Sequence, residues 1–294
     1  MTRVAHVALA LLVTVACTQG KETVAIPRST PTPAPSVSPT QEDEREPRER
    51  EDTSDRWVTA RPSWLGKRVL PKGPSGFGVA GETPPILRNR RFPTIDILPA
   101  PKRERFAATI GPVPRSVLAR STWRPRCPVA ESDLSYLTMT FWGLDHEAHT
   151  GEMIVHASVA EEITGVFEAL FHARFRIEEM RVVTLKEQRR WRTAPTGDTN
   201  VTSSFECRKA TLGSSWSEHS YGLAIDMNPF HNPYLRGDLV GPELARAYTD
   251  RTWERPGMIF EGDAVTRAFD AIGWGWGGRW SSLKDWMHFS QSGH

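Results

Sequence analysis

The sequence predicts an α+β fold, in which a small antiparallel sheet packs against helices on one side. Residues 134–142 alternate in polarity and are rich in aromatic and β-branched side chains, which is typical of a strand. Residues 151–156 are expected to form its partner. A segment with helical periodicity follows, and shorter strands and helices then alternate towards the C-terminus. This order of elements favours antiparallel pairing with the helices on one face.

The helix that follows these two strands has the strongest pattern. Ser158 is the predicted N-cap, and Glu161 three positions later would complete a capping box. Apolar side chains then recur at helical spacing and share one face: Val159, Ile163, Val166, Phe167, Leu170 and Phe171.

Five further elements are predicted closer to the C-terminus. Strands are expected over residues 180–185, 222–227 and 287–290, and helices over residues 242–248 and 264–272.

The N-terminus has the features of an export signal. Arg3 and His6 give it a polar start, and the apolar run over residues 7–16 is too short to span a membrane as a mature helix. Small residues then precede Cys17, as in the bacterial lipobox, where cleavage exposes a cysteine that carries the lipid. We expect an extracytoplasmic protein, anchored to the bacterial membrane through Cys17 and preceded by a signal peptide over residues 1–17. A plain secretory signal and a retained anchor are the alternatives.

The next segments differ from a folded domain in composition. Residues 18–56 combine prolines, small polar residues and a mixed charge run without aliphatic or aromatic side chains, which predicts a disordered tether. Residues 57–117 contain apolar side chains interrupted by many prolines and glycines. They are expected to form an extended arm that wraps the folded domain, or else a second part of the linker. The folded domain is expected over residues 118–294.

The overall charge gives no reason to expect a nucleic-acid partner. The chain has 37 lysines and arginines against 35 acidic residues, a formal net charge of +2. We expect a monomer.

The cysteines permit one disulfide. Export places the chain in an oxidising compartment, and Cys127 and Cys207 remain as an even pair once Cys17 is set aside. A bond between them would close a long loop and stabilise the fold by roughly 4 kcal/mol. Two separate buried thiols are the alternative.

Three side chains in the C-terminal half have the composition of a metal site. His219, Asp226 and the distant His288 offer two nitrogens and one oxygen, a common set for a zinc ion whose fourth position is open to water. Gly222 allows a turn after which the next strand returns Asp226 to His219, with the small Ala224 on the same face. The alternative is a polar turn, with His219 at the surface and Asp226 as a helix cap or ion-pair partner.

An additional acid lies close to the last of these residues. Asp285 is three positions before His288 and would take a proton from an attacking water. Its alternative role is to orient a ligand histidine. The tryptophan- and glycine-rich residues 273–280 are expected to form one wall of a cleft, with aromatic core packing as the alternative.

The order of these residues is similar to that of a known family. S-x-H-x-x-G-x-A-x-D over residues 217–226, followed by D-x-x-H over residues 285–288, resembles the zinc D-alanyl-D-alanine carboxypeptidase-like family of bacterial cell-wall peptidases. The resemblance extends over roughly residues 120–294. It implies the hedgehog/DD-peptidase α+β fold, and its zinc ligands carry over onto His219, Asp226 and His288.

The resemblance also implies roles for other residues. It makes Asp285 the catalytic acid and base, Arg208 the arginine that contacts substrate, and Ser217 a substrate-binding hydroxyl. The implied substrate is the peptide stem of peptidoglycan. Removal of a terminal D-alanine and cleavage by an L-alanyl-D-glutamate endopeptidase both remain open.

Two other classes of protein compete with a peptidase. One is a non-catalytic zinc domain that binds the wall, against which Asp285 argues, because a binding module needs no base. The other is a zinc-free wall-binding lipoprotein, which metal analysis would distinguish.

Overall fold

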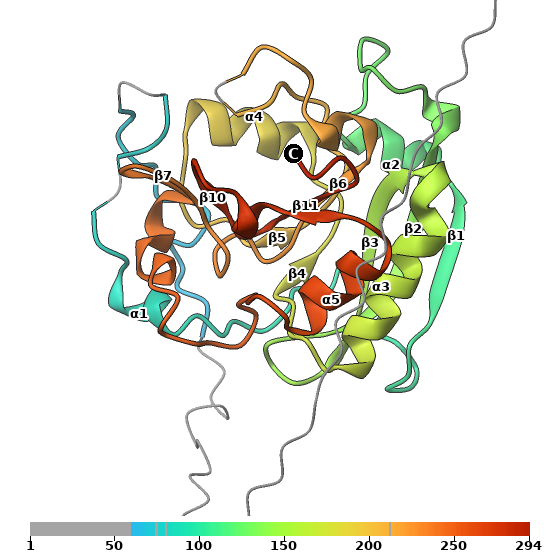
Figure 1. The fold of residues 1–294 in the computed structure, drawn as a ribbon, viewed down its shortest axis with the longest axis horizontal. Helices are drawn as coiled ribbons and strands as arrows, with labels where there is room; N and C mark the ends of the chain where they lie inside the picture. Colours follow the sequence, from blue (N-terminus) through green and yellow to red (C-terminus); the bar gives the residue numbers. More distant parts are fainter. Residues whose placement is uncertain (1–59, 74–75, 80, 212) are drawn as a thin grey trace, which may run out of the picture. The chain divides into compact units, whose positions relative to one another are not determined.

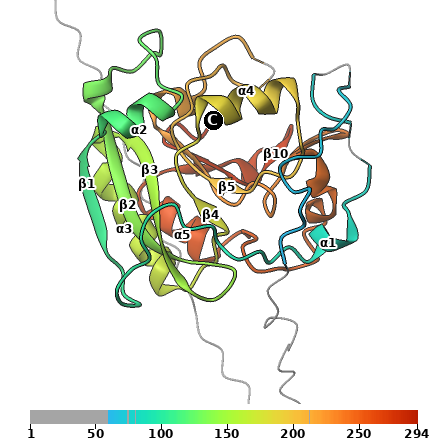
Figure 2. The same ribbon diagram turned by 180° about the vertical axis from the view of Figure 1, so that it is seen from behind.

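Short, mostly antiparallel sheets alternate with helices along the chain, which confirms the predicted α+β class (Figures 1 and 2). The computed structural model describes residues 60–294 apart from residues 74–75, 80 and 212.

The N-terminal predictions concern other residues. The signal peptide over residues 1–17, the lipid-bearing Cys17 and the tether over residues 18–56 lie outside the described part of the chain. Among the residues that are described, no helix has the length and apolar character needed to cross a membrane.

The largest sheet packs against one long helix. Helix α3 (Ala160–His172) covers one face of this sheet (Figures 1 and 2). Phe167 of the helix and Leu137 of the central strand belong to one buried apolar cluster. The strands are antiparallel, in the order β1 (Ala108–Pro112), β2 (Leu134–Trp142) and β3 (Ala148–His156).

The start of α3 differs from the predicted capping box. A short 3-10 helix, η3 (Ala157–Val159), precedes α3, and His156 caps it by accepting a hydrogen bond from the backbone nitrogen of Ser158. The Ser158 hydroxyl hydrogen-bonds to the same ring at 2.7 Å. Ser158 therefore contacts the residue before it, and the predicted reciprocal bond with Glu161 was wrong.

A capping box occurs at α4 (Leu185–Thr193), which the sequence analysis did not predict. The Thr184 hydroxyl accepts from the backbone of Glu187, whose carboxylate accepts from the backbone of Thr184. The helix has one buried residue, Gln188, so no apolar stripe marked it. Instead of the strand expected over residues 180–185, the chain forms a two-residue strand, β4 (Glu179–Met180).

A second sheet joins the two halves of the sequence motif. Its strand order is β6 (Ala224–Asp226), β11 (His288–Ser290) and β9 (Gly275–Trp276), all antiparallel. Helix α5 (Ala264–Ala271) packs against it, with the Phe269 ring stacked on the Phe289 ring at 4.0 Å between centroids. These residues share one core cluster with α3 and the first sheet.

The remaining elements are short. In the segment predicted as a helix over residues 242–248, the chain forms a 3-10 helix. The strands are β4 (Glu179–Met180) and its parallel partner β5 (Val201–Thr202), and a sheet ordered β10 (Lys284–Asp285), β7 (Tyr234–Arg236) and β8 (Leu239–Gly241). The helices are α1 (Pro85–Arg88), α2 (Arg115–Arg120), η2 (Glu131–Asp133), η4 (Glu218–Tyr221), η5 (Glu243–Thr249) and η6 (Gly277–Arg279).

The described residues before position 118 pack into the fold. Leu87 and Phe92 are fully buried and share an apolar cluster with Phe230 and Tyr248. Strand β1 extends the first sheet. This segment therefore supplies both core and sheet residues.

A buried polar network joins the same segment to the rest of the domain. The Arg90 guanidinium donates two hydrogen bonds to the Glu178 carboxylate, at 2.7 and 2.8 Å. Asn200 donates to the same carboxylate at 2.7 Å and lies 3.0 Å from His231 Nδ1. His231 Nε2 lies 3.0 Å from the carbonyl oxygen of Arg90. Each of these side chains is nearly or fully buried, so the network satisfies polar groups that would otherwise be costly.

Candidate metal centre

Three side-chain atoms converge where β6 and β11 pair. His219 Nε2 lies 3.2 Å from His288 Nδ1 and 3.3 Å from Asp226 Oδ1. His288 Nδ1 lies 3.1 Å from the same Asp226 oxygen. The two histidines are 1% and 7% exposed, so the three atoms form a closely spaced and largely buried set.

The backbone determines this arrangement. Asp226 and His288 lie directly opposite each other in the antiparallel pair β6–β11, which places their side chains next to each other. His219 lies on η4, which ends at Gly222 in the left-handed conformation, with φ of 72°. A Cβ atom at Gly222 would lie 2.5 Å from the backbone nitrogen of His156, so a side chain cannot be accommodated there. The turn therefore brings β6, and with it Asp226, back to His219.

The outer nitrogens of both histidines contact backbone carbonyls. His219 Nδ1 lies 2.7 Å from the carbonyl oxygen of Ser204, and His288 Nε2 lies 3.3 Å from that of His294. A carbonyl oxygen only accepts, so each outer nitrogen carries the proton. In neutral imidazoles, the inner nitrogens then present lone pairs to one another and to Asp226.

This donor set fits a zinc ion. Ligand atoms bound at 2.0–2.1 Å in a tetrahedron lie about 3.3 Å apart, close to the three separations between His219, Asp226 and His288. Three converging lone pairs repel one another unless a cation or a proton lies between them. The carbonyl bonds to the outer nitrogens are the contacts that usually orient ligand histidines.

The charges in this site act on Asp226. Burial alone would raise its pKa, but the positive charge of a protonated His219, together with hydrogen bonds from His219 and His288, outweighs burial and holds the pKa of Asp226 below its usual range. Asp226 is therefore ionised at neutral pH, as a metal ligand must be.

Asp285, on β10, has a different environment. Its Oδ1 is buried without a hydrogen-bond partner among the described residues. Burial and the nearby charge of Asp226 raise the pKa of Asp285 to about 7, against opposing effects of His288 and Arg208. Gly277 allows this close packing, because a Cβ atom there would lie 2.6 Å from the Asp285 carbonyl oxygen. Asp285 and Asp226 line the same cleft.

The tryptophan-rich residues 273–280 belong mainly to the core. Trp274 and Trp276 are 2% and 5% exposed and pack in the main apolar cluster. Trp276 Nε1 donates to the carbonyl oxygen of Trp286 at 2.8 Å, which fixes the chain just before His288. Within this run Trp280 contacts the site directly, with its ring centroid 5.5 Å from that of His288.

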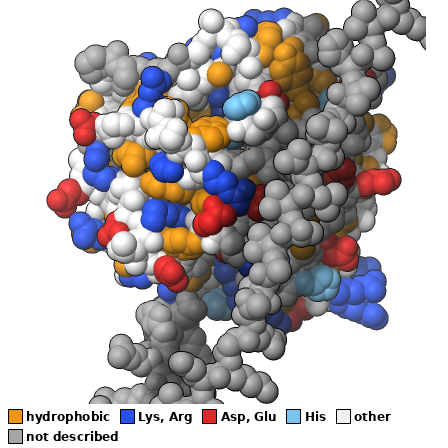
Figure 3. Space-filling view, in the orientation of Figure 1, with side chains coloured by type: hydrophobic (Ala, Val, Ile, Leu, Met, Phe, Trp, Pro, Cys, Tyr) orange, Lys and Arg blue, Asp and Glu red, His pale blue; other side chains and the backbone are white. Residues whose placement is uncertain are grey.

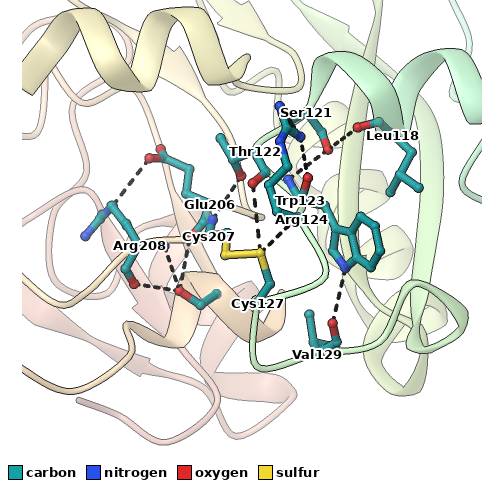
Figure 4. The surroundings of a disulfide bond; sticks show 11 residues. Leu118, Ser121, Thr122, Trp123, Arg124, Cys127, Val129, Glu206, Cys207 and Arg208 are labelled. Carbon is teal, nitrogen blue, oxygen red and sulfur yellow. Dashed lines mark hydrogen bonds and ion pairs between the residues drawn. A yellow bond between two sulfur atoms is a disulfide. The ribbon is translucent and has the colours of Figure 1, made fainter.

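A disulfide joins Cys127 to Cys207 and lies next to Arg208 (Figure 4). Arg208 Nε donates to the Glu206 carboxylate at 3.3 Å. The Ser220 hydroxyl accepts from the backbone nitrogen of Arg208 and donates to its carbonyl oxygen. These contacts hold Arg208 in the wall of the cleft.

Ser217 lies behind that wall. Its backbone nitrogen donates to the carbonyl oxygen of Arg208, and its side chain is largely buried. Ser217 is not among the described residues that line the cleft. The structure thus places it beneath Arg208.

The cleft has a volume of about 690 Å³, within the range of small-ligand sites. Beyond the metal centre it is lined by residues that the sequence analysis did not identify, from the segment before residue 118, from α4 and from the loop after Arg208. They include Lys72, Phe77, Gln188, Trp191, Arg192 and Lys209. Their positions depend on long-range packing, and only the Thr184–Glu187 capping pattern marks α4 in the sequence.

Comparison with known proteins supports the motif. Residues 211–291 match the family model described as D-alanyl-D-alanine carboxypeptidase, which confirms the resemblance seen in the sequence and supports a peptidase. The matched residues include His219, Asp226, Asp285 and His288, whereas Arg208 precedes them. No curated protein and no solved structure matches the chain.

Proposed function

We propose that this chain is a zinc-dependent peptidase that hydrolyses the peptide stem of peptidoglycan. Its residues 211–291 match the D-alanyl-D-alanine carboxypeptidase family model. D-alanyl-D-alanine carboxypeptidase activity is the reaction that this family match favours. One observation carries the proposal: in a cleft, three ligand-type atoms converge near the carboxyl group of Asp285, whose Oδ1 has no hydrogen-bond partner among the described residues.

The roles of the residues follow from their chemistry. His219, Asp226 and His288 would hold the metal, and a zinc ion there would polarise the scissile carbonyl and lower the pKa of a water to about 7. Asp285 accepts a proton from the attacking water and passes it to the nitrogen of the leaving amine. A carboxyl group with a pKa near neutrality suits both steps, because it must take up and release the same proton.

Arg208 is the proposed substrate arginine. Arg208 lines the cleft, and its guanidinium donates to Glu206 and to the carbonyl oxygen of Lys209, which leaves further N–H groups for a substrate carboxylate or carbonyl. Ser217 would act by supporting the backbone of Arg208.

The proposal includes the setting of the enzyme. A lipid on Cys17 would tether a monomer to the outer face of the bacterial membrane, and the segment over residues 18–56 would let it reach the wall. The catalytic domain would have the hedgehog/DD-peptidase arrangement.

Product analysis tests the proposal. The zinc-loaded protein is incubated with purified muropeptides, with and without a chelator, and the products are identified by mass spectrometry. Loss of a terminal D-alanine that stops with chelator and returns with zinc is expected. Cleavage between L-alanine and D-glutamate, which leaves L-alanine on the sugar and frees the rest of the stem peptide, would identify an L-alanyl-D-glutamate endopeptidase. Absence of any cleavage would favour a non-catalytic wall-binding protein.

A further inference from the structure

The cleft extends beyond the metal centre to a region that lies outside the family match. Its far end is lined by Gln188, Trp191 and Arg192 of α4 and by Lys72 and Phe77 of the N-terminal segment. These residues precede residue 211, where the matched part of the chain begins. This end of the cleft is therefore a feature of this chain that the family match does not describe.

Gln188 is the distinctive side chain in this region. It is 8% exposed, lines the cleft, and its Nε2 has no hydrogen-bond partner among the described residues. An unpaired buried amide is costly, and in a residue that lines a cleft a bound ligand would supply the missing partner. The amide nitrogen donates, so its missing partner is an acceptor.

The charges nearby favour an anionic acceptor. Lys72 donates to the carbonyl oxygen of Arg192 at 2.7 Å, which places these two basic residues together. Among the described residues, neither has a carboxylate within ion-pair distance. The acid at this end, Glu243, accepts a hydrogen bond from the backbone nitrogen of Gly78 at 2.6 Å.

We infer that Gln188, with Lys72 and Arg192, forms a subsite for a carboxylate of the substrate peptide, remote from the scissile bond. This inference rests on the proposed function. Gln188 donates a hydrogen bond to the carboxylate, and the two basic side chains provide a favourable potential at the mouth of the subsite. Trp191 and Phe77, which also line the cleft, offer apolar surface to the peptide.

The floor of the cleft connects the subsite to the metal centre. The chain leaves α4 through Pro195 and Gly197 and reaches Ser203, all of which line the cleft. Ser203 pairs with Asp226 as an isolated bridge. A substrate peptide lying along this floor would therefore contact both regions at once.

Two matched peptides test the subsite. They are L-Ala-γ-D-Glu-L-Lys-D-Ala-D-Ala and its D-isoglutamine counterpart, which differ in one carboxylate that is free in the first and amidated in the second. Steady-state kinetics with the zinc-loaded protein should give a lower KM for the free acid and a similar kcat. Calorimetric binding of the corresponding tetrapeptides, which lack the terminal D-alanine, measures the same preference without turnover.

Variants separate the contributions. Gln188→Leu should weaken binding of the free acid by roughly 10–100-fold, the range for a hydrogen bond to a charged group, and should remove most of the preference over the amide. Its melting temperature should be unchanged or higher, because the variant loses an unpaired buried group. If Gln188 has only a structural role, the melting temperature should instead be lower.

Lys72→Gln and Arg192→Gln should each weaken binding by a few-fold. Arg189→Gln, which removes the same charge from an exposed position on α4 outside the cleft, is the control and should have no effect.

The outcomes distinguish this inference from the proposed function. Turnover of both pentapeptides with equal KM, or a Gln188→Leu variant that keeps the preference, would overturn the subsite alone. Selective binding of the free acid without any turnover would support the subsite and contradict the proposed peptidase.

Discussion

Two carboxyl groups in the candidate metal centre have opposite pKa shifts. Burial raises the pKa of both, but His219 and His288 more than compensate at Asp226. Asp285 has no hydrogen-bond partner on Oδ1 among the described residues, and its pKa is raised to about 7. When the environment shifts the pKa values of two neighbouring carboxyl groups in opposite directions, the ionised group suits metal binding and the other suits proton transfer.

Replacement of Asp285 by asparagine tests this division at the residue scale. Asp285→Asn keeps the shape and removes the proton acceptor, so the rate should fall by at least roughly 10²–10⁴-fold while zinc stays bound. If Asp285 only orients a ligand, the variant should instead lose roughly 10–100-fold in zinc affinity and recover at saturating zinc. Turnover of a stem peptide measured across a zinc titration separates these results. Asp238→Asn, at an exposed position, is the control.

At the scale of elements, the metal centre depends on the turn between η4 and β6. Gly222 has φ of 72°, and its neighbours His156 and Val155 leave no space for a side chain. Gly273 has a similar φ of 76° but no atom within 4 Å of an added Cβ. An alanine at Gly273 would therefore introduce backbone strain alone, whereas an alanine at Gly222 would introduce both backbone strain and steric overlap.

Gly222→Ala should lower both stability and zinc affinity. Gly273→Ala should lose about 1 kcal/mol of unfolding free energy, the usual cost of a left-handed alanine. Gly222→Ala should lose more, because η4 must also move away from β3, which displaces His219. Urea unfolding and zinc competition with a chelator measure the two effects. Equal losses in the two variants, with unchanged zinc affinity, would contradict this account of the turn.

The sequence predicted some elements well because their patterns are local. Strand β2 and the apolar face of α3 follow from alternation and helical spacing within one segment. Helix α4 was missed because its side chains are mostly polar, and its one buried residue, Gln188, faces the cleft. The three candidate ligands were identified from residue order, but the register that opposes Asp226 to His288 required the structure.

At the scale of the whole molecule, burial of long-range polar pairs was not predictable. Arg90 and Glu178 are 88 positions apart, and nothing in either local sequence indicates their pairing. Basic and acidic side chains are intermixed on the face shown in Figure 3, in keeping with the small net charge of +2. Which charges become buried depends on packing of the segment before residue 118.

The buried His231 should make the fold sensitive to acid. Burial lowers the pKa of His231 to about 4, with Arg90 adding to this effect and Glu178 opposing it. The unfolded chain, with a histidine pKa near 6.5, binds this proton more readily, so stability is full above pH 6.5 and falls as the pH drops towards 4. The expected loss of unfolding free energy approaches about 1.4 kcal/mol per pH unit below pH 6.5, and it amounts to about 3 kcal/mol between pH 6.5 and pH 4.

The difference between the wild type and His231→Gln isolates this effect. In the variant, the unfolding free energy should no longer decrease as the pH falls from 6.5 to 4.5. Glu178, whose pKa is lowered, contributes to the pH dependence only below this range. Urea unfolding at several pH values measures it, and His172→Gln, on the exposed end of α3, is the control. A slope that is unchanged in His231→Gln would show that another group is responsible.

The most direct test of the central claim is the zinc content of purified protein. His219, Asp226 and His288 together should hold one zinc ion per chain in the wild type and in His172→Ala. His219→Ala should lose the ion and the peptidase activity together, because a buried ligand nitrogen is removed. Equal, stoichiometric zinc in the wild type and in His219→Ala would contradict the assignment of the metal centre.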